Sequence, residues 1–329
     1  MKETVSLICT VRDEADNIAA LLDSMLAQSR PPDEIVINDC GSRDATASIV
    51  QGYAARDRRI ICVSGGHNIS SGRNNAIAAA SGPLIACTDA GLVLDRDWLA
   101  HLIAPLDEQR ADLAGGFFRP APRSLFELVL GATNYRHPDE IVPERFLPFG
   151  KSMAFRKTLW EALGGFPEWA SHCEDVVFDL AAERAGYRRV FVPEAQLCFR
   201  PRSSLRAFAR QYFFYARGDG VAGLWRLRHL VRYTTYFALF LLLLVGWRFP
   251  GVRWPVAALL GSGGVFYTRQ PYRRLWPQIQ TLTWDRRLLA LALVPVIRLV
   301  GDCAKMAGYP VGVIQRLPMQ QRQQQRQKP

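Results

Sequence analysis

The sequence lacks the features that identify several common classes of protein. Its seven cysteines include no Cys-x-x-Cys pair, so we expect neither a zinc site nor a disulfide framework. The N-terminus, MKETVSLICT, has no charged segment followed by an apolar one, so we expect no signal peptide and a reducing, cytoplasmic location for the first 200 residues. No Gly-x-Gly-x-x-Gly motif follows the first predicted strand, which disfavours an NAD-binding fold.

Acidic residues are scarce in the last third of the chain. Residues 201–329 contain 20 Lys and Arg against three Asp and Glu, a balance of +17, whereas residues 1–200 contain 21 against 27, a balance of −6. Nucleic acid is one partner for a basic segment. Because these basic residues flank long apolar runs, we favour anionic lipid and expect no nucleic-acid partner. The composition therefore predicts a protein of the cell membrane whose first 200 residues lie in the cytoplasm.

Strand and helix patterns alternate over the first 90 residues. Helical spacing of apolar residues recurs between short apolar runs that read as strands. This alternation predicts an α/β fold with a mostly parallel sheet and right-handed crossovers. Ligands bind such sheets beyond the carboxyl ends of the strands, where Thr10, Asp39 and Asp89 lie. The predicted strands cover 4–10, 34–39, 59–64 and 83–89, and the predicted helices cover 16–28, 44–55 and 72–80.

Three apolar runs follow residue 220, at 233–247, 254–268 and 288–301. A membrane-spanning helix needs about 20 residues, which the first run nearly reaches. We expect hydrophobic membrane helices here: two inserted helices, then an interfacial helix or, alternatively, a third span, with both termini cytoplasmic. The predicted organisation is a catalytic domain over 1–220, a membrane-associated helical region over 221–315 and a disordered basic tail over 316–329.

Several motifs occur in an order that resembles the family 2 glycosyltransferases of the GT-A fold. They are VSLICTVRDEADN with EIVINDCGSRDAT, then SGRNNAIAAASGPLIACTDAGLVLDRDWL, then GKSMAFRKTLWEALGGFPEWASHCEDVVFDLAAERAGYRRV. The resemblance covers roughly residues 3–220. It implies a Rossmann-like nucleotide-sugar-binding domain and an inverting transfer from a nucleotide-diphosphate sugar to an acceptor.

The resemblance implies roles for residues on the donor side. Asp39 matches a position that contacts the nucleobase, and Thr10 and Arg12 match positions beside the base and ribose. Arg73 matches an arginine near the nucleoside, where it would add positive charge. The alternative for Arg73 is a salt bridge on the surface of a helix.

Asp89 matches the first aspartate of the family's Asp-x-Asp metal motif, which implies Mg²⁺ or Mn²⁺ as a cofactor. Gly91 stands where the second aspartate is expected, so this chain departs from the pattern. A divalent ion on a diphosphate can use one carboxylate with phosphate oxygens and water, so we expect a weakened site. Asp95 and Asp97 are alternative ligands, but a turn and the start of a helix explain them better.

The sequence HCEDVVFD contains a second pair of carboxylates. In the family a Glu-Asp pair supplies the general base, so Asp175 is the predicted base and Glu174 its neighbour, which orients it or raises its pKa. The alternative is that both acids cap the helix that begins here. His172 could add a metal ligand, although a lone histidine is more often structural.

The residues after the pair bear on the product and the acceptor. Processive members of the family have a Gln-x-x-Arg-Trp motif, whereas this chain keeps Gln211 but has Phe214 and Tyr215 in the last two places. We therefore expect transfer of single sugars to a lipid-linked or glycan acceptor of the cell envelope. The aromatic and basic residues from Phe208 to Trp225 predict an interfacial helix.

Two other functions compete with a glycosyltransferase. A sugar-1-phosphate nucleotidyltransferase would need a glycine- and arginine-rich loop after the first strand, which CTVRDEADN lacks. A non-catalytic membrane sugar-binding protein would explain Gly91, but not the retention of Asp39, Asp89 and Asp175 together. The sequence specifies neither the sugar, the nucleotide nor the acceptor.

Overall fold

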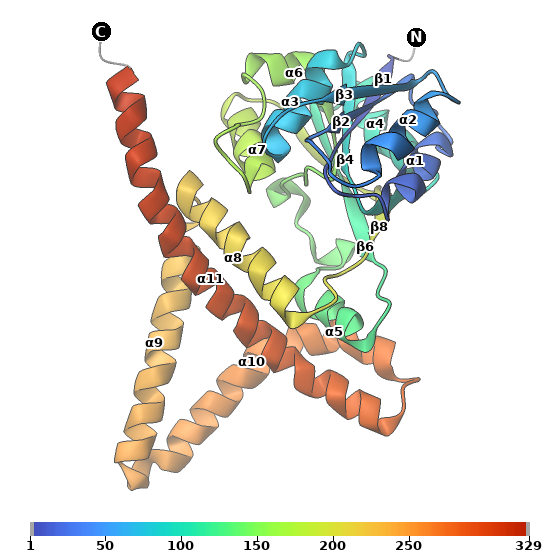
Figure 1. The fold of residues 1–329 in the computed structure, drawn as a ribbon. Coiled ribbons are helices and arrows are strands. Elements are labelled where there is room, and N and C mark those ends of the chain that lie inside the picture. The colour runs from blue at the N-terminus through green and yellow to red at the C-terminus, as the bar shows by residue number, and fades with distance from the viewer. Residues whose placement is uncertain (1–2, 327–329) are drawn as a thin grey trace. The chain divides into compact units, whose positions relative to one another are not determined.

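The computed structural model describes residues 3–326, with side chains up to residue 316. The chain folds as two compact units. The sheet unit comprises the residues up to 121 together with 136–200, and the helical unit comprises 122–135 together with the residues from 201 onward (Figure 1). The functional division expected at residues 220 and 315 remains a prediction.

Half of the sheet is parallel, as the sequence predicts. The four strands that open the chain lie in the order β3-β2-β1-β4, and each pairs in parallel with its neighbour. β1, β2 and β4 are buried on both faces, which explains why they are mostly apolar. Their bounds are β1 (Val5–Val11), β2 (Glu34–Asp39), β3 (Ile60–Ser64) and β4 (Leu84–Asp89).

The other half makes the sheet mixed: the expectation of a mostly parallel sheet holds throughout the first four strands, and beyond them β6 and β8 also pair in parallel. The order continues β4-β7-β6-β8-β5. β7 pairs antiparallel with both β4 and β6, and β5 pairs antiparallel with β8. The regular strand–helix alternation ends after β4, so nothing in the later sequence forces a parallel crossover. These strands are β5 (Leu92–Leu94), β6 (Leu113–Pro120), β7 (Ser152–Arg156) and β8 (Arg189–Phe199).

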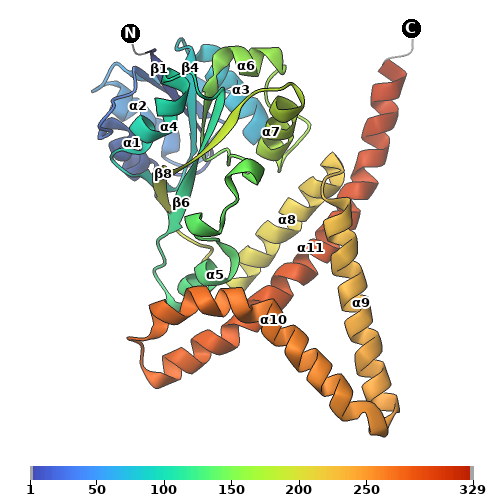
Figure 2. The ribbon, with the colours of Figure 1, turned by 180° about the vertical axis from the view of Figure 1, so that it is seen from behind.

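Helices cover both faces of this sheet (Figures 1 and 2). One face packs against α3 (Ile69–Ala79), α6 (Lys157–Ala162) and α7 (Glu174–Arg184), with Ile77, Phe155 and Phe178 in the shared core. α1 (Ile18–Leu26) and α4 (Trp98–Asp107) pack elsewhere on the sheet, and α2 (Thr46–Ala54) packs beside α1 and β3. Two short 3-10 turns, Pro138–Glu140 and Pro143–Arg145, precede β7.

The helical unit contains α5 (Leu125–Asn134), α8 (Leu205–Ala222), α9 (Arg226–Arg248), α10 (Arg253–Ile279) and α11 (Trp284–Arg326). Its core joins α5 to α8, α10 and α11 through residues such as Leu130, Leu275 and Val294. α8 and α11 approach so closely that a Cβ at Gly308 would lie 2.1 Å from the carbonyl oxygen of Phe213, so glycine is required there. The tail expected to be disordered falls on the end of α11 and on 327–329, which lie outside the described residues.

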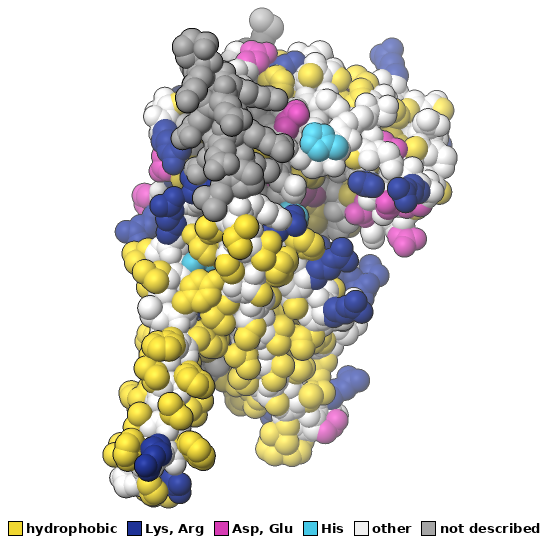
Figure 3. Space-filling model, turned by 60° about the vertical axis from the view of Figure 1, so that its left-hand side comes forward, with side chains coloured by type: hydrophobic (Ala, Val, Ile, Leu, Met, Phe, Trp, Pro, Cys, Tyr) yellow, Lys and Arg dark blue, Asp and Glu magenta, His cyan; other side chains and the backbone are white. Residues whose placement is uncertain are grey.

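Apolar side chains gather on the surface of the helical unit (Figure 3). Among the described residues, α9 alone is long and apolar enough to cross a membrane, and none of its apolar window is buried in the protein. α9 and α10 are joined by a short 3-10 turn at Pro250–Val252, and Gly246 of α9 packs against Val256 of α10. Two membrane-crossing helices were expected from the sequence, and one meets the length and composition of a span.

The end of the sheet opposite the carboxyl edge contains a buried carboxylate that we expect to stabilise the fold. Glu34 accepts hydrogen bonds from the Ser6 hydroxyl, from the backbone and hydroxyl of Ser81 and from the Gly82 amide. Burial alone would raise the pKa of Glu34, but these hydrogen bonds outweigh it and lower the pKa. A depressed pKa in the folded state stabilises the protein above the unfolded pKa, and that stabilisation is lost as the pH falls.

We therefore predict that Glu34→Gln destabilises the chain near neutral pH by about 1–3 kcal/mol, the cost of an unsatisfied buried donor. The difference in unfolding free energy between the wild type and Glu34→Gln should shrink as the pH falls below about 4.5, because Glu34 then becomes protonated and loses its charge. Urea denaturation at several pH values measures it. The exposed Glu161 in α6 gives the control Glu161→Gln, and equal effects of the two substitutions would contradict the prediction.

Candidate functional site

Three of the predicted site residues lie at the carboxyl edge of the parallel strands. Thr10 lies beside Asp89 in the β1–β4 register, and Val11 lies beside Asp39 in the β1–β2 register. Asp39 and Asp89 therefore flank β1 from opposite sides. This is the edge at which the sequence predicts a ligand.

Thr10 belongs to a small polar cluster under the start of α3. The Asn38 side-chain amide donates to the Thr10 hydroxyl at 3.2 Å and to the Gly65 carbonyl at 2.9 Å. Gly72 of α3 lies directly above, where a Cβ would lie 2.2 Å from the Thr10 hydroxyl oxygen. Thr10 is buried, so in this structure it positions α3 against the edge.

Asp39 and Arg12 lie in loops at the same edge. Asp39 Oδ1 accepts hydrogen bonds from the backbone and the hydroxyl of Ser42, at 2.9 and 2.6 Å, which fixes the turn after β2. Arg12 follows β1 and is half exposed, with its Nε 3.9 Å from Asp13. Both side chains lie within reach of solvent.

Arg73 holds two of the predicted carboxylates together. Its side chain is 2% exposed, and its two terminal nitrogens donate to Asp89 Oδ1 and to Glu174 Oε1, each at 2.6 Å. Burial would lower the pKa of Arg73, but Asp89 and Glu174 outweigh burial and raise it. The arginine is therefore a buried clamp and not a surface salt bridge, the alternative left open by the sequence.

Asp175 sits next to this clamp at the first turn of α7. Its Oδ2 accepts from the Gly150 amide at 3.0 Å, and its Oδ1 accepts from the Val176 amide at 2.8 Å. Gly150 itself packs on the Arg73 guanidinium, where a Cβ would lie 2.5 Å from both terminal nitrogens. The loop before β7 thus contacts both charged groups, and only glycine fits at its end.

The neighbouring acids on α7 differ in environment. Burial raises the pKa of Glu174 to about 7, with Arg73 opposing the shift and Asp175 adding to it. One turn further along, burial also raises the pKa of Asp179 well above its ordinary value, and neither of its oxygens has a hydrogen-bond partner in the described part of the chain. Glu174 therefore forms an ion pair with Arg73, whereas Asp175 binds the loop before β7.

Lys151 is a charged group of this site that the sequence reasoning missed. Its ammonium lies 3.5 Å from the centroid of the Phe118 ring and 4.3 Å from that of Phe199. Burial lowers the pKa of Lys151 to about 8, although the carboxylates of Asp89 and Asp175 oppose the shift. The signal was present in the sequence GKSMAFR, where a lysine directly precedes an otherwise apolar, buried strand.

The groups that could hold a metal ion are few. Asp89 Oδ1 is taken by Arg73, while no hydrogen bond from a described residue reaches its Oδ2. Gly91 has φ +75°, and a Cβ there would lie 3.9 Å from Glu14 Oε2. Asp95 pairs with Arg119 at 2.6 Å, and Asp97 precedes α4, as a turn and a helix start predict. Within residues 3–316, no three His, Cys, Asp or Glu side chains are grouped as a metal site.

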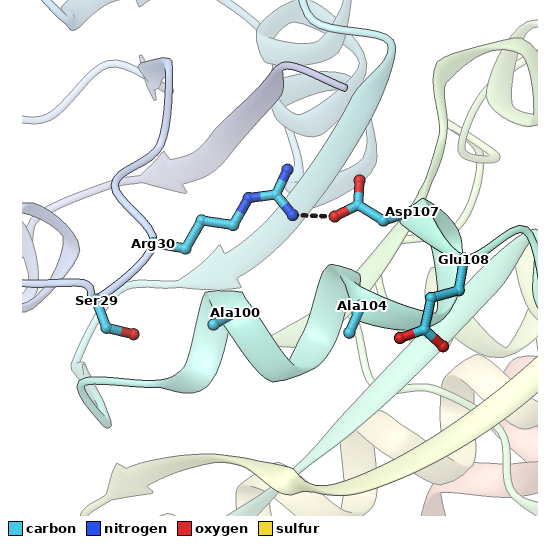
Figure 4. A pocket seen from close by; sticks show the side chains of 6 residues that line it. All are labelled: Ser29, Arg30, Ala100, Ala104, Asp107 and Glu108. Carbon is cyan, nitrogen blue, oxygen red and sulfur yellow. Dashed lines mark hydrogen bonds and ion pairs between the residues drawn. The ribbon is translucent and has the colours of Figure 1, made fainter. Parts of the chain in front are cut away.

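Two other features are explained within their own elements. Gln211, the remaining residue of the processive motif, donates to the Tyr215 hydroxyl at 2.8 Å within α8. A surface hollow between the end of α1 and α4 is lined by Ser29, Arg30, Ala100, Ala104, Asp107 and Glu108 (Figure 4). Arg30 and Asp107 form an ion pair across it, which explains both charges without a ligand.

Comparison with known proteins agrees with these features. Residues 6–165 match the family model for glycosyl transferase family 2. Glycosyltransferase AglE of Haloferax volcanii is 27% identical over 249 residues, which cover 74% of this chain and 80% of AglE. The succinoglycan biosynthesis protein ExoA of Rhizobium meliloti is 28% identical over 219 residues, 63% of this chain and 66% of ExoA.

A solved structure shares the fold. The mannosyltransferase PcManGT from Pyrobaculum calidifontis, in complex with GDP-Man and Mn²⁺, superposes with a TM-score of 0.55 at 19% identity. The superposition covers 96% of this chain and 88% of that one. The likeness supports a GT-A-like α/β domain with a mixed sheet.

The Arg73 clamp generates a prediction about stability. Arg73→Met leaves Asp89 and Glu174 without their buried partner and should destabilise the chain by about 3–5 kcal/mol. Adding Glu174→Gln to Arg73→Met should recover part of the loss, because one uncompensated charge is then removed. Urea denaturation measures both, with Arg58→Met as the control at an exposed arginine. A loss for Arg73→Met no larger than that of the control would show that the clamp does not hold the fold.

Proposed function

Because the chain belongs to glycosyl transferase family 2, we propose that it transfers a single sugar from a nucleotide-diphosphate sugar to a membrane-associated or cell-envelope acceptor, with inversion. The observation that carries this proposal is the buried Arg73, which contacts Asp89 on the donor side and Glu174 beside Asp175. One guanidinium thus ties the residue proposed for the diphosphate to the helix that bears the proposed base. The relatives AglE, named a glycosyltransferase, and ExoA, named for succinoglycan biosynthesis, support the same class of reaction.

The donor would bind along the carboxyl edge of β1, β2 and β4. Asp39 would accept a hydrogen bond from the nucleobase, and Thr10 and Arg12 would lie beside the base and ribose. The positive charge of Arg73 is already satisfied by two carboxylates, so it would act on the nucleoside side by positioning Asp89 and α3.

Asp175 would act as the general base. Two backbone N–H groups hold its carboxylate, from Gly150 and from Val176, which fixes its direction before an acceptor arrives. The acceptor oxygen attacks the anomeric carbon of the sugar as its proton passes to Asp175. The bond from that carbon to the diphosphate breaks on the opposite face, and the electron pair leaves with the diphosphate. A single displacement of this kind inverts the configuration.

The site could hold a divalent cation, Mg²⁺ or Mn²⁺, with only one carboxylate as a protein ligand. Asp89 Oδ2 would hold it, and phosphate oxygens and water would fill the remaining positions. Bound there, the cation would neutralise charge on the leaving diphosphate. Gly91 supplies no second carboxylate, so we expect weak binding of the metal. PcManGT was solved with Mn²⁺.

We also propose that the helical unit holds the protein at the cell membrane, with the sheet unit in the cytoplasm. The observations behind this are the exposed apolar surface of α9 and α10 and the basic excess after residue 200. α9 and the first half of α10 would insert as a hairpin, and α11 would lie at the interface. The acceptor would then be lipid-linked or a glycan at that surface.

Our prediction for the reaction concerns Asp175. The purified chain is first tested with a panel of UDP- and GDP-sugars, with and without Mn²⁺, for hydrolysis and transfer. Asp175→Asn should then lower turnover by about 10²-fold or more, the scale of a lost general base, while nucleotide binding stays near normal. Asp95→Asn, which removes an acid paired with Arg119 in the same unit, is the control. Wild-type turnover in Asp175→Asn would reject the assignment of the base.

A second prediction concerns the path of the chain through the membrane. Arg226, Arg228 and Arg232 stand at the start of α9, which should keep that end cytoplasmic. A reporter that is active only outside the cytoplasm should be active when fused after Gly251 and inactive when fused after Thr283 or at the C-terminus. Activity after Thr283 would mean that α9 crosses alone and that α10 does not return.

A further inference from the structure

The ammonium of Lys151 is held by aromatic rings and not by a carboxylate. Among the described residues it forms no hydrogen bond or ion pair, and its neighbours are the rings of Phe118, Phe149 and Phe199. The Phe118 ring centroid lies 5.0 Å from that of Phe199 and 5.2 Å from that of Phe149, so Phe118 packs against both of the other rings. A cation over aromatic faces keeps its N–H groups available for an anion.

The register of the sheet brings Lys151 to Asp89. β4 and β7 pair antiparallel with Thr88 opposite Ser152 as the last pair of the ladder, and Asp89 and Lys151 are the next residues beyond that pair. On the other side of Lys151, the Gly150 amide donates to Asp175 at 3.0 Å. Lys151 therefore lies in the turn between the end of the ladder and the amide that holds Asp175, where the charges of both Asp89 and Asp175 act on it.

A positive charge at Lys151 would compensate for the weak metal binding that Gly91 implies. The proposed metal cage has one carboxylate where two are expected, so a cation there would bind weakly. A diphosphate still carries its negative charge, and a weakly held ion leaves part of it uncompensated. Arg73 is already bound to two carboxylates, whereas Lys151 rests on aromatic rings and keeps its charge available for a phosphate.

We propose that Lys151 binds the β-phosphate of the donor and supplies positive charge that a full metal cage would otherwise provide. This inference rests on the proposed function, because it assumes a nucleotide-diphosphate donor at the carboxyl edge. The three phenylalanine rings fix the ammonium next to Asp89 before the donor arrives, so little conformational entropy is lost when the phosphate binds. Lys151 is thus assigned to the leaving group.

The proposed role of Lys151 predicts different effects on nucleoside diphosphates and on nucleoside monophosphates. A nucleoside diphosphate has the phosphate that Lys151 would contact, whereas the monophosphate lacks it. UDP and GDP, with UMP and GMP as their partners, are therefore the probes, and isothermal titration calorimetry of the full chain measures their binding in EDTA and in Mn²⁺. This readout does not depend on turnover.

Three variants test the role of the charge. Lys151→Met keeps an unbranched side chain that packs well on aromatic rings, so the fold should be retained. Lys151→Arg keeps the charge. Lys157→Met is the matched control, since Lys157 donates to the Ala80 carbonyl at the far end of α3. Gly91→Asp, combined with Lys151→Met, restores the missing carboxylate.

In EDTA, Lys151→Met should weaken binding of the diphosphate by about tenfold or more, the scale of a lost charge-assisted hydrogen bond. Monophosphate binding should stay within about twofold, since the contact to the β-phosphate is absent there. Lys151→Arg and Lys157→Met should resemble the wild type. In Mn²⁺, Gly91→Asp should recover part of the affinity that Lys151→Met loses.

The inference fails if Lys151→Met weakens both ligands equally or neither, or if wild-type affinity for the diphosphate disappears in EDTA. These results leave the proposed function intact, because a nucleotide still binds under some condition. A wild-type chain that binds none of the four nucleotides, with or without Mn²⁺, overturns the proposed function and the inference together.

Discussion

A buried guanidinium is the constraint on which this site depends. Arg73 is almost fully removed from water, and a charge so placed is stable only when opposite charges and hydrogen bonds replace its hydration. Asp89 comes from the end of β4 and Glu174 from the start of α7, which are far apart in the sequence. Their pairing with one side chain of α3 therefore fixes the positions of three elements relative to one another. Gly150 adds a fourth, because its loop packs on the guanidinium and binds Asp175.

The sequence predicted the parallel half of the fold well and the rest poorly. β2 and β4 begin and end within a residue of their predicted bounds because each is an apolar run that ends in an aspartate. The later strands have no such regular spacing, and β6 and β8, which pair in parallel, do so across a register shift between Gly115 and Phe117. Local patterns reveal a strand, but its partner depends on long-range packing that no local pattern encodes.

The candidate site shows the same division. The acids at the strand ends and on α7 are visible from motif order, and the structure brings Asp89, Glu174 and Asp175 close to one arginine. The sequence could not show that Arg73 would be buried between two of them. Nor could it single out Lys151, because the rings around its ammonium come from β6, the loop before β7 and the end of β8. Proximity of this kind arises only when the sheet is assembled.

The balance of charge at this edge indicates that a bound metal ion would still assist diphosphate binding when Lys151 is present. Three carboxylates, Asp89, Glu174 and Asp175, face two fixed cations, Arg73 and Lys151, so the edge is not positive enough to receive a diphosphate unaided. Burial raises the pKa of Glu174 to about 7, so protonation of that residue would shift the balance in the donor's favour. A weakly bound divalent ion would do the same on the Asp89 side. In its proposed role the lysine would lower the demand for the metal without removing it, which is consistent with a site that keeps Asp89 and has Gly91 in place of its partner.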